Sequence, residues 1–545
     1  MRRESRSCRL AGWPGSDLAR GGASSARRKG RTGIWAGAAR RPPVGAFARQ
    51  RRGLMSSSRL QRGRARRVPL MPMYFCAVLA IAAVALAATA GAAFAGNANI
   101  VRQGTPPSKF PPNTHYFKTI QAAVNASTAG DYVLIEPGVY YEPVNVTGAQ
   151  SGIWIRGMNR NKVIIDGQNK AGNGIDVHQA NNVWIDNLTV RNFDTGPECP
   201  VEECGNEIWW DGAVNSKSSN VEAHGWYGSY LTAYDTGLNG GYGLFTSHET
   251  EGSWNNIYAS GFNDSGMYIG ACQECDARVT RAVMENNSLG YSGSNSGGTL
   301  VIEKSIFRGN STGVVPNSEA PGDKPPPQDG ECGRPNVENP NPEPIITTTR
   351  IERCTVFRNN LITENNNSTV PVNGSTARAS FGNGIILPGT YADLVERNVI
   401  ANNEKTGLFG IELPVDVFVF QVAGNRISNN VFANNGSKGG PFTGDITLGS
   451  GFVELAGLGE SQSKNNCVSA NVLPDATFPA KIQGTWGCQH ETTPNPGGAP
   501  EIYEYVARVE AETPGERHPV GQPAPPPQPT MPNPCQGAPK NPLCP

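Results

Sequence analysis

A glycine recurs in this chain at intervals of 23 or 24 residues. The interval joins four consecutive glycines and later a further pair: Gly243, Gly266, Gly290 and Gly313, then Gly384 and Gly407. Each glycine precedes a short apolar or aromatic stretch, and an asparagine stands three or four residues ahead of most of them. A fixed period of about 20–50 residues indicates structural units that stack on one another. The chain is therefore expected to form one solenoid.

Within each period, apolar and polar residues alternate over runs of only three to five residues. Such runs are typical of β-strands and are too short for ordinary helices. Seven residues before the glycine, an apolar residue recurs and predicts a core column: Ala259, Val283, Ile306 and Ile400. Coils stacked about 4.8 Å apart would give each backbone amide a partner in the neighbouring coil. Glycine and asparagine suit the corners because both tolerate positive φ, and asparagine amides can form a ladder along the stack.

The opening segment of this region carries a resemblance. Residues 117–124 (FKTIQAAV) and 130–140 (GDYVLIEPGVY) resemble the capping helix and first strand of right-handed parallel β-helix proteins of the pectate-lyase-like superfamily. The resemblance covers roughly residues 110–490. Phe117, Ile120 and Val124 lie on one helical face, so the helix would seal the core of the first coil. The expected fold is all-β, a single-stranded right-handed parallel β-helix with a short N-terminal capping helix.

The N-terminal region does not read as part of the solenoid. The first 67 residues hold nineteen lysines and arginines against two acidic residues, with no apolar period. Residues 1–54 are expected to be a start-site artefact or a disordered basic segment. The apolar run at 74–93 follows basic residues and precedes Ala93-Phe94-Ala95, so residues 55–95 are predicted to be a signal peptide. A single membrane anchor and a basic arm that binds nucleic acid are the alternatives.

The remaining boundaries follow from composition. The β-helix is predicted over residues 96–490, with loop excursions near 197–212 and 316–344 that carry clustered polar residues, prolines and cysteines. Residues 491–545 form a proline-rich tail with one short strand expected at 502–509. Its composition is typical of a linker or a tail close to a cell wall. The protein is expected to be a monomer.

Charge limits the partners. Of 47 basic and 46 acidic residues, 19 and 2 precede residue 68, so 28 and 44 remain and the mature chain carries a net charge of −16. Nucleic acid is therefore not an expected partner. A polyanionic sugar would also be repelled, unless Ca²⁺ bridged it or positive residues clustered locally. Ca²⁺ is the only cofactor that the sequence suggests, and no metal ligands can be named.

Ten of the twelve cysteines follow residue 95, and neighbours along the chain form plausible disulfides. The suggested pairs are Cys199 with Cys204, Cys272 with Cys275, Cys332 with Cys354, Cys467 with Cys488, and Cys535 with Cys544. Spacing alone does not fix the connectivity. Five local disulfides predict a secreted or cell-surface protein. The alternative for Cys272 and Cys275, a redox or zinc motif, has no second cysteine pair or histidine cluster to support it.

Candidate site residues concentrate between residues 209 and 276, because outward side chains on successive coils can line a groove for an extended polymer. Aromatic rings stack on sugars, and carboxylates bind hydroxyls or Ca²⁺. The substrate-binding candidates are aromatic: Trp209, Trp210, Trp226, Tyr227, Tyr230, Tyr234 and Tyr242. The catalytic candidates are acids and one histidine: Asp211, Asp235, His248, Glu249 and Glu251.

Two cleavage chemistries are open. Hydrolysis needs two carboxyl groups at a set separation. A lyase needs a base beside a neutralised uronate, and Arg278, Arg281 or Lys304 could serve. The sequence lacks the motifs of polygalacturonases, pectinesterases and alginate epimerases, and residues 183–187 match a pectate lyase strand motif only without its histidine. We therefore expect a secreted β-helix protein that binds, and in one reading cleaves, extracellular polysaccharide. The alternative is a non-catalytic, wall-associated structural or adhesive protein, and a copper-handling relative is a third reading without Met or His clusters to support it.

Overall fold

The computed structural model describes residues 96–196, 203–213, 223–272, 274–318, 354–415, 418–450, 452, 463, 465–488 and 500–545. The predictions for residues 1–95, for residues 197–202 and 319–344 of the two loop excursions, and for Cys199 and Cys332 lie outside the described residues. None of the described helices is long and apolar enough to cross a membrane.

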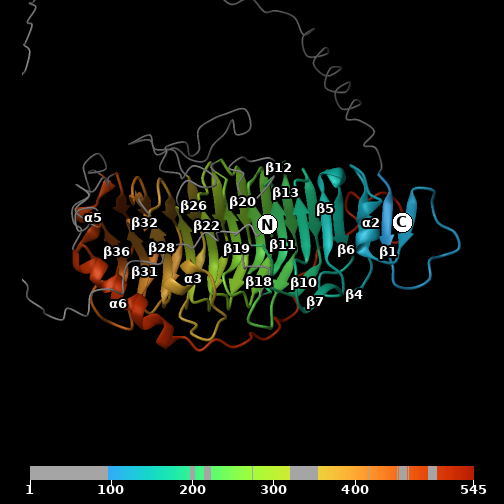
Figure 1. Cartoon of the computed structure of the whole chain (residues 1–545). Coiled ribbons are helices and arrows are strands. Elements are labelled where there is room, and N and C mark those ends of the chain that lie inside the picture. The colour runs from blue at the N-terminus through green and yellow to red at the C-terminus, as the bar shows by residue number, and fades with distance from the viewer. Residues whose placement is uncertain are drawn as a thin grey trace, which may run out of the picture. The chain divides into compact units, whose positions relative to one another are not determined.

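The described chain is a right-handed parallel β-helix, as the sequence predicted (Figure 1). Three parallel sheets, named A, B and C, run along it. Sheet A contains β1 (Ala98–Val101), β2 (Thr114–Phe117), β3 (Tyr132–Ile135), β6 (Trp154–Gly157), β9 (Val183–Asp186), β13 (Trp226–Ser229), β17 (Gly252–Asn255), β20 (Ala277–Thr280), β23 (Leu300–Glu303), β26 (Thr355–Arg358), β29 (Leu394–Glu396), β34 (Arg426–Ser428) and β37 (Cys467–Ser469). Sheet B contains β4 (Gly138–Tyr140), β7 (Val163–Ala171), β10 (Thr189–Asp194), β14 (Thr232–Tyr234), β18 (Tyr258–Ser260), β21 (Val283–Glu285), β24 (Ile306–Arg308), β27 (Leu361–Thr363), β30 (Val399–Ala401) and β35 (Val431–Ala433). Sheet C contains β5 (Val144–Thr147), β8 (Ile175–His178), β11 (Asn206–Asp211), β15 (Tyr242–Ser247), β19 (Ser265–Gly270), β22 (Leu289–Ser294), β25 (Thr312–Asn317), β28 (Asn383–Pro388), β31 (Thr406–Ile411), β36 (Gly444–Gly449) and β38 (Thr477–Phe478).

Short elements decorate the coils. A parallel pair forms from β12 (Ala223–His224) and β16 (Glu249–Thr250), and an antiparallel pair from β32 (Leu413–Val415) and β33 (Phe418–Phe420). The helices are α2 (Ile120–Asn125), α3 (Ser375–Ala379), α5 (Ile482–Thr485) and α6 (Pro500–Glu516), with a 3-10 turn at Gly148–Gln150. The capping helix is confirmed: α2 buries Ile120, Ala123 and Val124, and the Thr119 side chain accepts a hydrogen bond from the Ala122 amide at its start.

The repeating glycines form one column on sheet C, because their strand neighbours pair in register from β15 to β31. A Cβ atom on Gly290 or Gly313 would lie 2.5 Å from the carbonyl oxygen of the next glycine in the column. These glycines are therefore required by the close approach of neighbouring coils. Positive φ, the reason expected from the sequence, occurs at other corner residues.

The predicted apolar column needs a correction. Ala259 pairs with Met284, and Met284 with Phe307, whereas Val283 pairs with Tyr258 and Ile306 on the outer face of sheet B. The inner column is Ala259, Met284, Phe307, Ile362 and Ile400. The reason is that the step from one coil to the next varies by one or two residues, and a shift of one residue moves a strand side chain to the opposite face.

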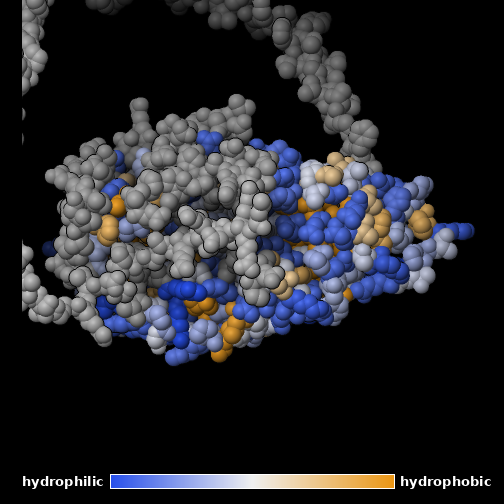
Figure 2. All heavy atoms as spheres, viewed as in Figure 1, coloured by the Kyte–Doolittle hydropathy of each residue, from blue (hydrophilic) through white to orange (hydrophobic). Residues whose placement is uncertain are grey.

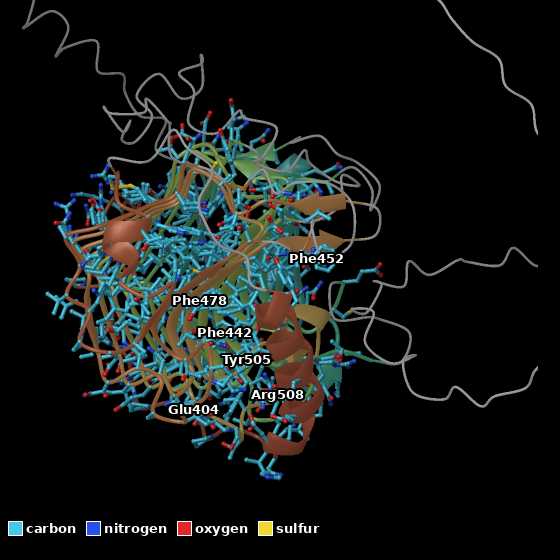
Figure 3. The ribbon with its side chains drawn as sticks, turned by 90° about the vertical axis from the view of Figure 1, so that its left-hand side faces the viewer. Glu404, Phe442, Phe452, Phe478, Tyr505 and Arg508 are labelled. Carbon is cyan, nitrogen blue, oxygen red and sulfur yellow. A yellow bond between two sulfur atoms is a disulfide. The ribbon has the colours of Figure 1, made fainter. Side chains whose placement is uncertain are left out.

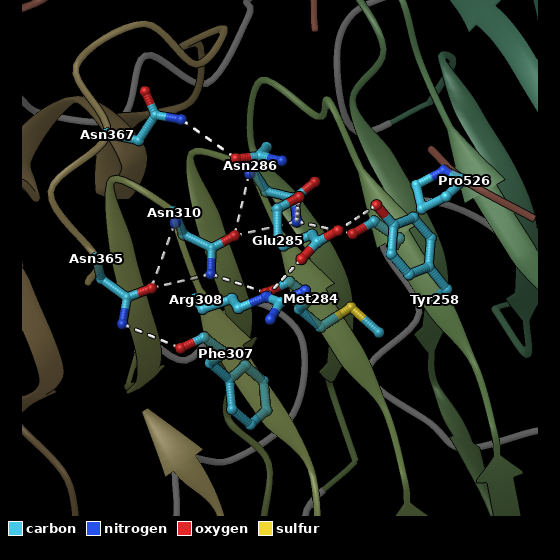
Figure 4. A network of polar contacts seen from close by, with 12 residues as sticks. Tyr258, Met284, Glu285, Asn286, Phe307, Arg308, Asn310, Asn365, Asn367 and Pro526 are labelled. Atoms are coloured by element: carbon cyan, nitrogen blue, oxygen red, sulfur yellow. Dashed lines mark hydrogen bonds and ion pairs between the residues drawn. The ribbon is translucent and has the colours of Figure 1, made fainter. Parts of the chain in front are cut away.

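Asparagine ladders run between the sheets, as expected. At the turn from sheet B to sheet C, the Asn287 amide donates to Asn310 Oδ1 at 3.2 Å. Asn310 in turn donates to Asn365 Oδ1 at 3.0 Å (Figure 4). Asn365 continues the series to Asn403 at 3.2 Å, and Asn403 to Asn435 at 3.0 Å. These buried amides hold the corners of neighbouring coils together.

The C-terminal segment is bound to the β-helix, which differs from the expected linker. Residues 500–516 form helix α6 instead of a strand, and Ile502 and Tyr503 bury themselves on the outer face of sheet C. Figure 3 views this end, where Phe442 packs against Phe478 at 4.7 Å and Tyr505 at 5.6 Å between ring centroids. The apolar side chains of this helix need a partner, and the last coils supply it.

Beyond α6 the tail returns along the coils, and in Figure 1 the C-terminus lies near β1. The Met531 amide and the Thr530 hydroxyl both donate to Asn187 Oδ1, at 2.8 and 2.7 Å. Buried Arg156 donates to the Gln536 carbonyl at 2.6 Å and pairs with Asp186 at 2.9 Å. The tail therefore connects the last coils to the first.

Three suggested disulfides have both cysteines in the described chain, and all three form: Cys272–Cys275, Cys467–Cys488 and Cys535–Cys544. Cys204 and Cys354 are also disulfide-bonded. The first of the three rules out a zinc site or a reduced thiol pair at Cys272 and Cys275 in this structure.

Candidate active site

Three successive strands of sheet C end at one place with polar side chains. His178 ends β8, Asp211 ends β11 and Ser247 ends β15. Asp211 pairs in register with both His178 and Ser247. The parallel stacking therefore brings together residues that are far apart in the sequence. Residues 206–211, expected in a loop, are strand because Ile208 and Trp210 point into the core.

The Asp211 carboxylate is held from several sides. Oδ2 lies 3.1 Å from His178 Nδ1, while Oδ1 accepts hydrogen bonds from the Ala213 amide at 3.0 Å and the Ser247 hydroxyl at 3.3 Å. His248 Nδ1 lies 3.9 Å from the same Oδ1. A carboxylate can only accept, so Nδ1 of His178 carries a proton and Nε2 is left to exchange one.

Exposure separates the roles of these groups. The His178 side chain is 48% exposed, whereas the Asp211 side chain is 10% exposed. His178 can meet a ligand from solvent, and Asp211 can orient and charge-stabilise its imidazole from below. This is the arrangement of a carboxylate-oriented general acid or base.

Two further carboxyl groups lie close by. Glu249 is 1% exposed, and neither of its oxygens has a hydrogen-bond partner in the described chain. Burial, and then the charge of Asp211, hold the pKa of Glu249 well above its ordinary value. Burial also raises the pKa of Asp176, with the charge of Asp211 adding to it and the Asn173 amide opposing it. The site therefore favours neutral carboxyl groups beside Asp211.

An aromatic row adjoins these groups. Asp176, Trp209, Phe245 and Tyr268 are consecutive partners across sheet C. Trp209 stacks on Phe245 with centroids 5.0 Å apart and planes within 2°, and its Nε1 donates to Ser247 Oγ at 3.2 Å. Trp209 and Tyr268 are partly exposed, while Tyr242 is buried against Phe245 and Tyr268. Ring surface suited to a sugar thus lies beside His178.

Other predicted binding residues lie elsewhere. Trp210 and Trp226 are fully buried core residues, so their prediction as substrate-binding residues is wrong: strand neighbours alternate, and Trp210 points inward where Trp209 points outward. Tyr227 stacks on Trp184 of sheet A at 4.8 Å. Tyr234 accepts a hydrogen bond from Arg191 on sheet B at 2.7 Å, and Tyr230 occupies a corner with a φ of 52°.

The predicted acids separate into three places. Only Asp211, His248 and Glu249 meet at the sheet C site. Asp235 accepts the Gly237 and Gly240 amides at 2.9 and 2.8 Å and so shapes its own turn. Glu251 lies near Tyr227 and Asp276, whose pKa values are raised mainly by burial and further by its charge.

The Asp235 turn holds a second acidic group. Burial, together with the charge of Asp235, raises the pKa of Asp194 to about 6 and that of buried Glu207 well above its usual range. Across the parts of the chain that the structure describes, no group of three or more His, Cys, Asp or Glu side chains is placed to hold a metal ion.

Sequence reasoning missed His178 and Asp176. The spacing from His178 to Asp211 is 33 residues, because the excursion after residue 196 lengthens this coil, so the 23-residue period does not align them. The signal that could have found them is the alternation itself: Asp176-Val177-His178 has the same outer–inner–outer pattern as Trp209-Trp210-Asp211.

No protein-family model and no curated protein matches the chain. Among solved structures, the A-module of mannuronan C-5 epimerase AlgE4 from Azotobacter vinelandii is 12% identical with a TM-score of 0.38, covering 65% of this chain and 90% of that one. An alginate lyase from Paenibacillus sp. is 10% identical with a TM-score of 0.35, covering 66% and 93%. Pectin methylesterase PemA from Erwinia chrysanthemi is 14% identical with a TM-score of 0.27, covering 50% and 80%. At identities and TM-scores this low, nothing follows for this chain from these structures, whereas its own strand registers make the described part a parallel β-helix.

Proposed function

We propose that the protein is secreted and that it binds and hydrolyses a polysaccharide on the outer face of sheet C, around His178, Asp211 and Trp209. The observation that carries the proposal is the half-exposed imidazole of His178 held at 3.1 Å by the buried carboxylate of Asp211, next to a partly exposed tryptophan. The disulfides support an extracellular location.

The proposed chemistry uses His178 as the general acid, so that two histidines take the places that a pair of carboxyl groups has in most glycoside hydrolases. Its Nε2 proton passes to the leaving glycosidic oxygen, while Asp211 holds the Nδ1 proton and stabilises the imidazolium. His248, on the other oxygen of the same carboxylate, is the second basic group and is proposed to accept the proton of the attacking water. Trp209 supplies the stacking face that fixes the sugar ring.

The charges favour hydrolysis of an uncharged sugar over elimination from a uronate. The site holds the Asp211 carboxylate beside Asp176 and Glu249, two carboxyl groups of raised pKa. The groups that hydrogen-bond Asp211 in the described chain are a histidine, an amide and a hydroxyl. A uronate would need a cation to neutralise its carboxylate. The bases considered from the sequence, Arg278, Arg281 and Lys304, belong to sheet A or the corner that follows it.

The alternative is a non-catalytic platform at a cell surface or wall. The tail supports this reading, because it binds the first and last coils together and would stiffen a rigid spacer. Binding of a glycan without turnover would favour it.

The test is an assay of the disulfide-intact full chain against neutral and uronic polysaccharides, with and without Ca²⁺, that follows new reducing ends and unsaturated products. His178→Ala and Asp211→Asn are expected to abolish the release of reducing ends. His115→Ala, which removes an exposed histidine on β2, is the matched control and should keep full activity. Unsaturated products would show that the reaction is elimination and not hydrolysis. Full activity in His178→Ala would overturn the proposed site.

A further inference from the structure

A second polar region lies at the corner between sheets A and B, away from sheet C. Arg281 and Lys304 follow the paired residues Thr280 and Glu303 and so occupy neighbouring coils, about 4.8 Å apart along the stack. Both have positive φ, 55° and 54°. Long basic side chains rarely adopt this conformation. The same corner position holds asparagine in other coils, at Asn256 and Asn359, and a third basic residue at Arg397.

The corner and the C-terminal tail line a cavity of about 210 Å³ that is open to solvent. Its lining includes three basic side chains, from Arg160, Arg281 and Lys304, and the tail residues Gln528 and Pro529. The tail wall is fixed: buried Arg160 donates to the Pro529 carbonyl at 3.0 Å and to the Thr232 hydroxyl at 2.7 Å. Asn161 and Gln528 exchange two hydrogen bonds of 2.8 Å. The docked tail therefore forms one wall of the cavity.

The neighbouring carboxylates do not neutralise the rim of this cavity. Glu303 is already paired with Arg278 and Arg358, each at 2.8 Å. Glu285 is paired with Arg308 at 2.6 Å. Arg281 is exposed, and Lys304, with a side chain 62% exposed, lies 3.8 Å from the shared Glu303. Positive charge is thus in local excess on a mature chain that is strongly acidic, and an anion is the complementary ligand.

The floor of the cavity is apolar. Val283 and Ile306 pair with each other on the outer face of sheet B and are partly exposed, and Ile257 and Ala282 lie beneath them. The Asn256 side chain adds a polar group to the same lining. A ligand here would lay a ring or other apolar body on the aliphatic floor and direct one charged group to the basic rim.

We propose that this cavity binds a saccharide ring that carries one oxyanion, a sulfate or a carboxylate, with the charged group at Arg281 and Lys304 and the ring over Val283 and Ile306. The volume fits one ring, being below the roughly 300 Å³ at which pockets for drug-sized ligands begin. The site is independent of the sheet C site, and either one can fail without the other.

The experiment is calorimetric titration of the disulfide-intact full chain with glucose 6-sulfate, glucuronate, glucose and inorganic sulfate. At least one of the two charged sugars is expected to bind, and to bind more tightly than glucose and than sulfate alone. Arg281→Gln with Lys304→Gln should weaken that binding about tenfold, the loss expected for two partly exposed charge-assisted contacts. Lys109→Gln with Lys540→Gln, two exposed lysines that do not line the cavity, changes the net charge equally and should leave the affinity unchanged.

A measurement on the unaltered protein adds a test that does not depend on a variant folding. The methyl NMR signals of Val283 and Ile306 should shift with the charged sugar and stay in place with glucose. Equal loss of affinity in both double variants would mean unspecific charge attraction and would overturn the site. Tighter binding of inorganic sulfate than of either sugar, no binding of any probe, or unmoved Val283 and Ile306 signals would overturn it too.

Discussion

One row of side chains runs along the outer face of sheet C, and its two halves differ. The partners Asp176, Trp209, Phe245, Tyr268 and Ser292 form the N-terminal half, and Val315, Ile386 and Phe409 continue the row. In the second half, α3 and α6 bury these residues in an apolar cluster. In the first half, Trp209 and Tyr268 stay partly exposed beside His178 and Asp211.

The backbone beneath both halves is the same. The glycine column passes through both, from Gly243 to Gly407, and the asparagine ladder follows much of it. The inner face therefore determines stacking, and the outer face is free to become either a site or a docking surface. Figure 2 shows one face of the N-terminal coils, where hydrophilic residues predominate and hydrophobic ones lie in scattered patches.

The largest effect is expected from a change in the glycine column, which both halves of the row share. Gly313→Ala would place a Cβ 2.5 Å from the Gly384 carbonyl oxygen and 2.9 Å from Asn365 Nδ2 and Ile362 Cγ2. Because backbone has to move, we expect a loss of about 4 kcal/mol or more in the free energy of unfolding, measured in urea. Gly515→Ala in α6 is the matched control, since nothing lies within 4 Å of its Cβ, and it should be neutral or slightly stabilising. Equal effects of the two would refute the role of the column.

The next largest effect should fall on the covered half alone. Ile502 of α6 is fully buried against the outer face of sheet C. Ile502→Ala is expected to cost about 3 kcal/mol by leaving a cavity. Hydrogen exchange should then quicken in β28, β31 and β36 while β8 and β11 stay protected. Val520→Ala, at a residue 54% exposed, serves as control. Loosening of β8 and β11 to the same extent would show that the halves are not separate.

A pH-dependent effect should appear in the open half. Burial raises the pKa of Glu249 above its value in the unfolded chain, so the folded protein keeps a proton that the unfolded chain gives up above about pH 4.5. Wild-type stability should therefore fall as pH rises from about 4.5 towards neutrality. Glu249→Gln cannot ionise and is expected to be more stable than wild type by about 1–3 kcal/mol at pH 7, and about equal at pH 4. A constant difference across this range in urea unfolding would contradict the raised pKa.

The sequence predicted what repeats and failed where the repeat changes length. The glycine interval marks the positions where the backbones of neighbouring coils come too close for any side chain. The solenoid and its corner ladders could therefore be predicted from it. The apolar column was misplaced by one residue, because the coil from Ala259 to Met284 is longer than the next. Trp210 was predicted to bind substrate because aromatic residues cluster in this stretch. Only the strand register shows that its side chain points to the inner face of sheet C.

The candidate site was predicted only in part. Asp211, His248 and Glu249 lie within the stretch of sequence that is densest in acids and aromatic residues, so they could be predicted. His178 lies on the preceding coil, and a long excursion separates it from Asp211 in the sequence. The tail was read as a linker because its prolines exclude regular structure. Its binding depends on individual amides and carbonyls, such as those of Met531 and Gln536, which no composition reveals.

The smallest effect on stability should coincide with the largest effect on activity. His178→Ala removes a half-exposed side chain that bonds to the Asp211 carboxylate at 3.1 Å. Exposed pairs of this kind contribute about 0–1 kcal/mol, so the unfolding free energy should change by less than about 0.5 kcal/mol. Glycan cleavage, if His178 is the acid, should fall by about 10²–10⁴-fold. His178→Gln should be equally inactive, because an amide cannot donate and regain a proton as imidazole does. A loss of several kcal/mol in the free energy of unfolding, or full activity of the variant, would show that His178 has a structural role like the residues of the covered half.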